Sequence, residues 1–282
     1  MALSDSETIE LGGETTVHRL GFGAMRLTGS DIIGPPASEA GAQDVLQRAV
    51  ELGVDFIDTA DAYGPGTSER LIAEALSPYP EEPVIATKGG LLRNLDGDWI
   101  PHGDPNYLHD AVLSSLDRLR TETIDLYQLH RPDPDVPIED SVTELAALQD
   151  RGKISHIGLS NVTVEELDRA SEVADIVTVQ NQYNVGYRED EDVLEVCEDR
   201  GIGFIPWFPL SAGALDAKRD ALESIAATHE ATVYQIALAW LLQHSPVLMP
   251  IPGTSSLDHL AENVAAASIE LSDEELARLT DS

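Results

Sequence analysis

Short apolar runs alternate along the chain with longer segments in which apolar residues recur every three or four positions. Apolar runs bounded by turn residues predict strands buried in a parallel sheet, and the longer period predicts amphipathic helices. The predicted strands end near Gly23, Asp58, Lys88, His130, Ser160, Gln180, Trp207 and Pro250. The predicted helices cover residues 40–52, 68–76, 107–119, 138–150, 164–170, 190–199, 233–243 and 257–267. Eight strand-then-helix units favour an α/β fold of the (β/α)8 TIM-barrel type over a doubly wound sheet, which normally uses fewer strands.

Residues 8–17, with Gly12 and Gly13 at their centre, predict an N-terminal β-hairpin ahead of the repeating units. No Pro-, Gly- or Ser-rich linker divides the sequence, so we expect residues 1–282 to form a single barrel domain. The N-terminal region has no basic segment followed by an apolar core, and no apolar run approaches the roughly 18 residues of a membrane helix. We therefore expect a cytoplasmic protein that does not associate with a membrane.

Acidic residues dominate the composition, with 51 Asp and Glu against 17 Lys and Arg and a net charge of -34. This charge would repel nucleic acid, while the 42% hydrophobic content argues against disorder. Acidic surfaces poor in lysine are typical of proteins that work in concentrated salt, where the Debye length falls to about 3 Å at 1 M. We expect a halophilic surface, with an acidic docking face for a partner as the alternative. The single Cys197 lies in a helical pattern and is expected to be buried by packing.

Polar residues close three of the predicted strands: Asp58, Lys88 and His130. In a parallel α/β barrel, the carboxyl ends of the strands form the edge at which chemistry is done. Tyr63 follows Asp58 by five residues, and a phenol with a pKa of roughly 10 becomes a better general acid when a neighbouring ammonium favours the phenolate. We therefore expect Lys88, held charged by Asp58, to lower the pKa of Tyr63. His130 would orient a substrate oxygen beside that hydroxyl.

Each of these residues also has a simpler interpretation. Asp58 could cap a turn or a helix, and Tyr63 could be a loop aromatic that packs on the barrel. His130 could be a structural histidine. Lys88 could instead form a Schiff base in a lyase of the aldolase type, which is the best alternative chemistry.

Two other kinds of site are disfavoured by the motifs. The segment from Gly21 to Arg26 begins like a dinucleotide fingerprint but has Arg26 where the third glycine is needed, and no P-loop occurs. The eight histidines form neither a His-x-His nor a His-Glu-x-x-His pattern, so no dedicated metal site is expected.

Residues 53–64, which read GVDFIDTADAYG, and the Ser68-Glu69 pair that follows resemble the signature of the aldo-keto reductases. Lys88 and His130 fall where that family has its lysine and histidine, and the resemblance extends over about residues 17–263. Within the superfamily, the segments 23–25, 34–36, 207–210 and 251–255 are most similar to the bacterial pyridoxal reductase branch. The resemblance implies hydride transfer from a nicotinamide cofactor to a carbonyl carbon, with Tyr63 as the general acid.

The resemblance also implies where the cofactor binds. Ser160, Asn161 and Gln180 match positions that hydrogen-bond the nicotinamide carboxamide, and Trp207 matches an aromatic residue that stacks on the nicotinamide ring. The pyrophosphate and adenosine would lie along the segments after strands seven and eight, the second of which leads into a helix N-terminus that suits phosphate. The other positions that match cofactor contacts are Gly23, Met25, Asp58, Phe208, Pro209, Leu210, Gly213, Gly253, Thr254, Ser255, His259, Glu262 and Asn263.

Two departures from the family pattern concern the 2′-phosphate of NADP. Many relatives have a lysine where this chain has Gly253 and an arginine where it has His259. We therefore expect NADP(H) to be preferred but NAD(H) to be usable. The substrate would contact Met25, Tyr63, Trp99 and His130, and the chain ends soon after the last predicted helix, at Ser282, without the long C-terminal loop of some relatives.

The sequence thus predicts an NADP(H)-dependent oxidoreductase that reduces an aldehyde or a ketone to an alcohol. Two alternatives remain: a nicotinamide-binding regulatory barrel subunit with little turnover, and a Schiff-base lyase that uses Lys88. We expect a monomer or a weak homo-oligomer whose only partner is its small-molecule substrate.

Overall fold

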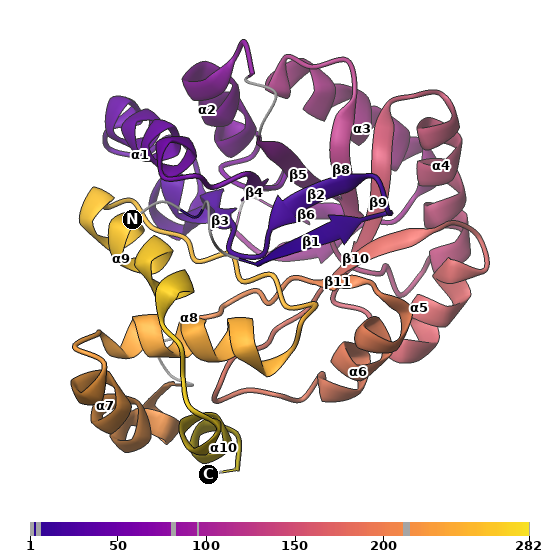
Figure 1. Cartoon of the computed structure of the whole chain (residues 1–282). Helices are drawn as coiled ribbons and strands as arrows, with labels where there is room; N and C mark the ends of the chain where they lie inside the picture. Colours follow the sequence, from indigo (N-terminus) through magenta and orange to yellow (C-terminus); the bar gives the residue numbers. More distant parts are fainter. Residues whose placement is uncertain (1–2, 4–6, 80–82, 95, 211–214, 282) are drawn as a thin grey trace.

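A computed structural model describes residue 3 and residues 7–79, 83–94, 96–210 and 215–281. Seven parallel strands lie side by side in the order β11-β10-β9-β8-β5-β4-β3 and curl into a barrel (Figure 1). Their bounds are β3 Phe22–Gly23, β4 Phe56–Asp58, β5 Val84–Gly89, β8 Ile124–Leu129, β9 Ile154–Ser160, β10 Ile176–Gln180 and β11 Gly203–Phe204. No described helix is long and apolar enough to cross a bilayer.

An eighth extended segment, residues 247–252, closes the barrel between the two edge strands. The amide of Phe204 in β11 donates to the carbonyl oxygen of Val247 at 2.8 Å, and the amide of Met249 returns a hydrogen bond to the Phe204 carbonyl at 2.8 Å. On the other side the amide of Gly21 donates to Pro250 O at 3.0 Å. The predicted (β/α)8 barrel is therefore confirmed.

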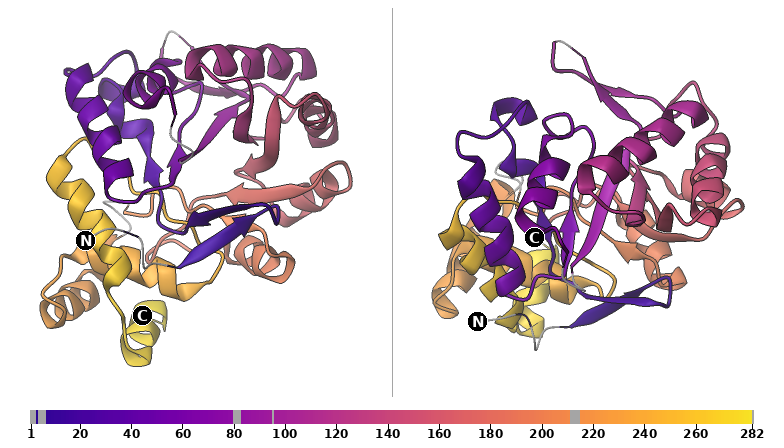
Figure 2. Two further views of the ribbon diagram at one scale, coloured as in Figure 1. Left: turned by 45° about the horizontal axis from the view of Figure 1, so that its top comes forward. Right: turned by 90° about the horizontal axis from the view of Figure 1, so that it is seen from above.

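The helices form a ring outside the barrel (Figure 2). They are α1 Glu39–Glu51, α2 Thr67–Leu76, α3 Pro105–Leu119, α4 Ile138–Asp150, α5 Val164–Ser171, α6 Glu191–Arg200, α7 Arg219–Thr228, α8 Val233–His244, α9 Leu257–Ala265 and α10 Asp273–Asp281. The larger apolar cluster fills the space between this ring and the strands, so each helix buries one face. Eight of these helices occupy the predicted segments to within two residues at each end.

The predicted N-terminal hairpin covers one end of the barrel (Figure 1). It consists of β1 Thr8–Leu11 and β2 Thr15–His18. Leu11 and Val17 are buried in the small second cluster together with the interior residues Phe56 and Met249. The hairpin therefore closes the amino-terminal end of the barrel, which leaves the carboxyl ends of the strands as the accessible end.

Four features of the fold differ from the prediction or were missed by it. Strand β11 ends at Phe204 rather than near Trp207, and segment 247–252 is extended without forming a regular strand. Pro206, Pro250 and Pro252 have no amide to donate between these two segments, whereas toward β10 the pairing continues from Ile205 N to Val179 O at 2.8 Å and from Trp207 N to Asn181 O at 3.0 Å. The prediction also missed α7 and α10, and it missed a second hairpin, β6 Leu91–Arg93 with β7 Trp99–Pro101, which lies at the opposite end of the barrel from the first (Figure 2).

Candidate active site

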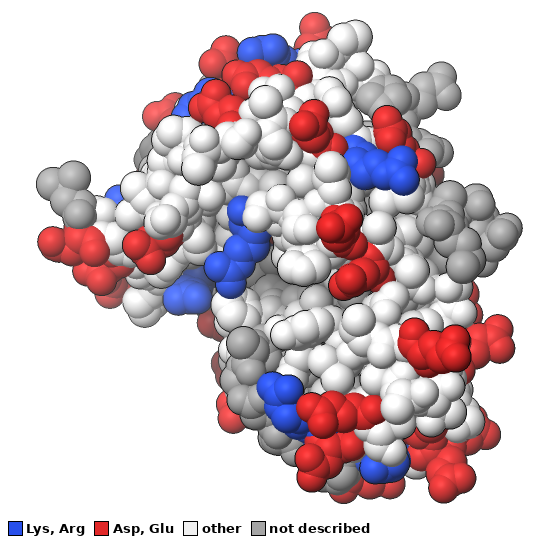
Figure 3. Space-filling model, turned by 90° about the vertical axis from the view of Figure 1, so that its left-hand side faces the viewer, with Lys and Arg blue, Asp and Glu red and all other residues white. Residues whose placement is uncertain are grey.

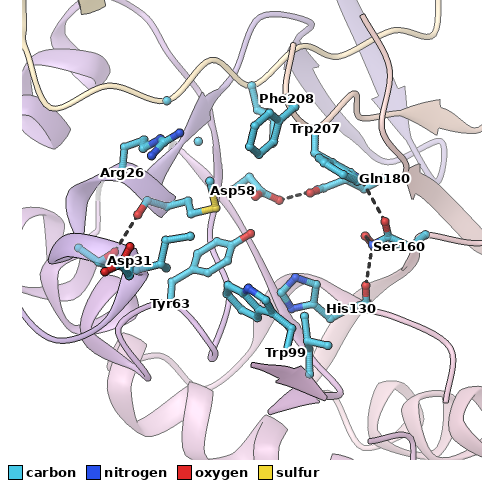
Figure 4. A pocket seen from close by; sticks show the side chains of 18 of the residues that line it. Arg26, Asp31, Asp58, Tyr63, Trp99, His130, Ser160, Gln180, Trp207 and Phe208 are labelled. Atoms are coloured by element: carbon cyan, nitrogen blue, oxygen red, sulfur yellow. Dashed lines mark hydrogen bonds between the residues drawn. The ribbon is translucent and has the colours of Figure 1, made fainter. Parts of the chain in front are cut away.

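Three neighbouring strands bring the predicted catalytic side chains together. Asp58 is the last residue of β4, Lys88 lies one residue before the end of β5, and His130 directly follows β8. These strands are adjacent in the sheet, and Lys88 is paired in register with Gln128 of β8. Tyr63 comes from the loop between β4 and α2, where its amide donates to Ala60 O and its carbonyl accepts from Ser68 N. The loop turns the phenol back over the strand ends, as Figure 4 shows.

Lys88 and Asp58 form a buried ion pair. The Lys88 side chain is 0% exposed and that of Asp58 is 3% exposed. The Lys88 ammonium donates to both oxygens of the carboxylate, at 2.8 and 2.6 Å, and to the carbonyl oxygen of Thr59 at 2.9 Å. Asp58 and the Thr59 carbonyl thus hold the ammonium, and the carboxylate raises the pKa of Lys88 despite burial. An ammonium held in this way is a poor nucleophile, which disfavours a Schiff base at Lys88.

Tyr63 is 7% exposed and lies between charged and aromatic groups. The Lys88 ammonium is 5.3 Å from the centre of its ring, and the rings of His130 and Trp99 meet it edge-on at centroid distances of 5.8 and 6.5 Å. Burial raises the pKa of Tyr63 above 10, and the charge of Lys88 opposes this rise without reversing it. The expected net lowering of the Tyr63 pKa is therefore wrong, because the cost of burying a phenolate exceeds the attraction of the ammonium.

His130 is neutral at physiological pH. Burial, together with the charges of Lys88 and Arg131, lowers its pKa well below 6.5. Its backbone amide donates to Gly89 O at 2.8 Å, whereas its side-chain Nδ1 is buried without a hydrogen-bond partner among the described residues. A neutral imidazole carries one N–H, so His130 can donate one hydrogen bond to a ligand oxygen without competing as an acid.

The ends of the next strands present the polar groups predicted for a carboxamide. Asn161 has φ 59° and uses its amide internally: Nδ2 donates to His130 O at 3.1 Å and to Ser160 Oγ at 2.9 Å, while Oδ1 accepts from Trp207 Nε1 at 3.1 Å. Gln180 donates through Nε2 to Asp58 at 2.7 Å. The Ser160 hydroxyl proton and the Gln180 Oε1 oxygen are left as one donor and one acceptor. These two groups fit a primary carboxamide, which offers one acceptor and a pair of donors.

A cavity of about 1010 Å³ opens at this end of the barrel and contains most of the predicted site (Figure 4). The predicted residues that line it are Gly23, Met25, Asp58, Tyr63, Trp99, His130, Ser160, Asn161, Gln180, Trp207, Phe208, Pro209, Leu210 and Gly253. Lys88 lies behind Asp58, outside the lining. Gly213 lies outside the described residues. The volume accommodates a dinucleotide's reactive end together with a small substrate.

The other predicted cofactor residues lie beyond the cavity lining. Thr254 Oγ1 accepts from Ser256 N at 3.0 Å, and Ser256 caps α9 by accepting from His259 N at 3.4 Å. The helix begins at Leu257, as predicted, and these two hydroxyl oxygens already serve the backbone. Ser255, His259 and Glu262 are exposed, and Asn263 is buried in α9.

Gly253 and Gly23 meet where the eighth segment crosses the end of β3. A Cβ atom on Gly253 would lie 2.6 Å from Gly23 O, and one on Gly23 would lie 2.7 Å from Ile251 O. Both contacts are shorter than real Cβ atoms show, so this backbone leaves no room for a lysine or any other side chain at position 253 unless it shifts. A Cβ atom on Gly253 would also lie 3.6 Å from Cγ of Arg26, the nearest side-chain atom.

The sequence interpretation missed three arginines that line the cavity: Arg26, Arg93 and Arg131. In the sequence Arg26 stands out only because it breaks a glycine motif, and no apolar run predicts the hairpin that supplies Arg93. Arg131 adjoins His130, and its adjacency to a strand end was the one signal that could have identified it. The described residues contain no cluster of three His, Cys, Asp or Glu side chains suited to a metal ion.

Comparison with known proteins identifies the family. The model of the aldo/keto reductase family matches residues 19–282. The chain belongs to this family. It is 48% identical over 276 residues to an uncharacterized oxidoreductase of Schizosaccharomyces pombe, covering 98% of this chain and 90% of that protein. It is 43% identical over 281 residues to the pyridoxine 4-dehydrogenase of Escherichia coli, covering 97% of each.

Solved structures of the family share the fold. A thermostable aldo-keto reductase in complex with the inhibitor epalrestat superposes with a TM-score of 0.87 at 32% identity, over 98% of this chain and 99% of that chain. An aldo-keto reductase from Klebsiella pneumoniae in complex with NADP and acetate superposes with a TM-score of 0.84 at 28% identity, over 98% and 95% of the two chains.

Proposed function

We propose that this aldo/keto reductase family member reduces an aldehyde or a ketone with NADP(H), using Tyr63 as the proton donor. The observation that supports this best is the convergence of Tyr63, His130 and the Lys88–Asp58 pair at one end of one cavity. Asp58, Tyr63, Lys88 and His130 are the proposed catalytic residues. Gly23, Met25, Ser160, Asn161, Gln180, Trp207 and the segment from Phe208 to Leu210 are the proposed cofactor contacts inside the cavity.

The bound nicotinamide would supply the hydride that reaches the carbonyl carbon. The chain's own groups handle the oxygen. Tyr63 transfers its hydroxyl proton to the oxygen as negative charge develops there, which is favourable even with a raised pKa because an alkoxide is a stronger base than a phenolate. Lys88, 5.3 Å from the Tyr63 ring centre, stabilises the phenolate that remains. His130 donates its single N–H to the same oxygen and fixes its position.

We infer that the substrate is a small, flat aldehyde of the kind represented by pyridoxal. Trp99 and Trp207 provide flat faces along the cavity, and the Escherichia coli relative is named for a pyridoxine dehydrogenase activity. Bulky steroid ketones should be poorer substrates. NADPH should be preferred over NADH, as the NADP-bound Klebsiella pneumoniae structure supports, although Gly253 and His259 replace basic residues of other relatives.

Oxidation of NADPH and of NADH against a panel of aldehydes tests this proposal. The panel should include pyridoxal, an aromatic aldehyde and a steroid ketone at matched concentrations. We expect turnover with NADPH and the flat aldehydes. Cofactor binding without turnover of any carbonyl compound would support the regulatory alternative, and trapping of Lys88 by borohydride with substrate would support the lyase.

A further inference from the structure

The cavity is electropositive although the chain is strongly acidic. Only 17 of its residues are Lys or Arg, yet Arg26, Arg93 and Arg131 all line the cavity. The acidic lining residues are Asp31 and Asp58, and the charge of Asp58 is compensated by Lys88. In the face shown in Figure 3, basic side chains border one side of the hollow in the middle, and acidic side chains lie across from them and over the rest of the face. The cavity is therefore suited to anions.

The three arginines lie at two ends of the cavity. Arg26 is beside Gly253 and on the side of Phe208, where the cofactor phosphates are proposed to lie (Figure 4). Arg93 stacks on Trp99 and Arg131 follows His130, and the rings of Trp99 and His130 both contact the ring of Tyr63 edge-on. Arg26 can pair with the phosphates of the cofactor. Arg93 and Arg131 lie too close to the reacting end for that role, so a different anion is needed to pair with them.

Arg93 is held in place by neutral groups. Its Nε donates to Gly97 O at 3.1 Å, its Nη2 donates to Asp31 O at 3.0 Å, and its guanidinium carbon lies 3.9 Å from the centre of the Trp99 ring. Its Nη1 is buried without an acceptor among the described residues. Backbone carbonyls and an aromatic face orient a guanidinium without neutralising it, so its positive charge acts on the cavity.

Arg131 has no compensating partner among the described residues. Its side chain is partly buried, makes no hydrogen bond or ion pair there, and has its Nε buried without an acceptor. A partly buried guanidinium in this condition is costly unless another group supplies the acceptor. Its position directly after His130 places it beside the reacting end of the cavity.

We propose that Arg93 and Arg131 form an anion subsite for the substrate, so that the preferred aldehyde or ketone carries a carboxylate or phosphate group. This inference rests on the proposed reductase function and narrows its substrate class. The anion would accept hydrogen bonds from Arg131 and be attracted by the fixed charge of Arg93, while the carbonyl oxygen lies between Tyr63 and His130.

Two matched substrate pairs test the proposal with the full chain and NADPH. The first pair is 4-carboxybenzaldehyde and its neutral methyl ester, and the second is pyridoxal 5′-phosphate and pyridoxal. For each pair the ratio of kcat/KM, charged over neutral, is measured. We expect a ratio of about 10 or more in at least one pair, the scale of a charge-assisted hydrogen bond, and the pair that shows it identifies the anion as carboxylate or phosphate.

Arg131→Gln should lower this ratio about tenfold, mainly through the KM of the charged substrate, and Arg131→Lys should restore part of it. Arg151→Gln is the matched control, because Arg151 is an exposed arginine at the end of α4, outside the cavity lining. Equal use of charged and neutral members by the wild type would overturn the subsite while leaving the reductase intact. The subsite would also be overturned if Arg131→Gln lowered kcat/KM equally for the charged and the neutral substrate. The same holds if the variant raised the KM of NADPH and not that of the charged substrate. If neither pair were reduced at all, the proposed function and this inference would both fail.

Discussion

Lys88 and Asp58 are buried ions, and each is tolerable only because of the other. Removing either from water costs several kcal/mol, which their mutual attraction and hydrogen bonds must offset. Gln180 and Gln128 contribute as well, since both direct Nε2 toward Asp58 Oδ1, at 2.7 and 3.3 Å. The pair holds the Lys88 ammonium in a fixed position, 5.3 Å from the centre of the Tyr63 ring.

Lys88→Met should therefore lower both stability and turnover. The change leaves Asp58 as an uncompensated buried charge, which should reduce the free energy of unfolding by about 3 to 5 kcal/mol. Adding Asp58→Asn should restore much of this stability but not the activity, because the charge beside Tyr63 stays absent. Urea unfolding and NADPH oxidation give the two readouts. Lys153→Met, away from the cavity, should change stability by no more than about 0.5 kcal/mol; full turnover in the double variant would contradict the role of Lys88.

Asp61 makes the free energy of unfolding depend on pH. Burial and the charge of Glu69 raise the pKa of Asp61 to about 7, and its Oδ1 is buried without a partner among the described residues. A carboxyl group whose pKa is raised on folding favours the folded state at low pH, and this contribution is lost as pH rises through the folded pKa.

Between pH 5 and pH 8, ionisation of Asp61 should thus lower the free energy of unfolding by on the order of 2 to 3 kcal/mol. Asp61→Asn removes this titration, so the variant should gain stability relative to the wild type at pH 8 more than at pH 5. Urea unfolding of both proteins at the two pH values measures the difference. A gap that is equal at both pH values would show that Asp61 does not titrate in this range.

At the level of single residues, the sequence predicted the position of a site residue correctly where that residue lies at the end of a strand. Asp58, Lys88 and His130 were identified because parallel strands end at one edge, whichever helices surround them. The net pKa of Tyr63 and the roles of Arg93 and Arg131 were not accessible in this way. They depend on how completely neighbouring elements bury each group, and sequence spacing carries no measure of that burial.

At the level of elements, two backbones approach each other closely beside the cavity, where β3 crosses segment 247–252. Gly23 and Gly253 let the two backbones approach, with a Cβ on Gly253 placed 2.6 Å from Gly23 O. The helix α9 begins shortly after this crossing, so the position of the crossing fixes where the helix N-terminus points. Glycine at position 253 is therefore needed for the close packing of the two backbones, and it also means that this position carries no positive charge.

Gly253→Ala should lower the free energy of unfolding by about 1 to 3 kcal/mol, the usual cost of overpacking. Gly253→Lys should do the same and should fail to increase the preference for NADPH, because the backbone must move before the ammonium can be placed. Ala261→Ser is the control on the following helix α9, since Ala261 is exposed and is not among the predicted cofactor contacts. Thermal unfolding and the ratio of kcat/KM for the two cofactors test this; a stable Gly253→Lys variant with a strengthened preference for NADPH would contradict it.

The pattern of elements was largely accessible from the sequence because amphipathic periods are local. Helices such as α4 were predicted at their observed bounds. The hairpin β6–β7 was missed because its strands have three residues each and pair outside the barrel, so no apolar run marks them. The regular part of β11 ends at Phe204, but the chain continues beside β10 to Trp207, whose amide donates to Asn181 O at 3.0 Å, so the predicted end near Trp207 lies in this extension.

At the level of the whole molecule, charge is the dominant feature. With a net charge of -34, like charges over most of the surface repel one another and oppose the compact state. Several acidic residues are used in ion pairs, as in the pairs of Arg169 with Glu139 and of Arg200 with Asp168. With 51 acids and 17 bases, the basic residues are too few to pair with every acidic residue.

If the surface is halophilic, the melting temperature should rise as KCl increases from about 0.1 M to 2 M. The Debye length shortens over this range from about 10 Å to less than about 3 Å, which screens the repulsion. A melting temperature that stays level or falls would favour an acidic docking face for a partner. The same titration should weaken any preference for an anionic substrate, because that attraction is screened as well.

The central claim, that Tyr63 gives its proton to the carbonyl oxygen, is tested most directly by Tyr63→Phe. This change removes one hydroxyl and keeps the ring that contacts Trp99 and His130. We predict that NADPH binding, followed by fluorescence, stays within about threefold of wild type while kcat for aldehyde reduction falls by about 10² or more, the scale of lost general acid catalysis. A Tyr63→Phe variant that binds NADPH and retains ordinary turnover would contradict the account.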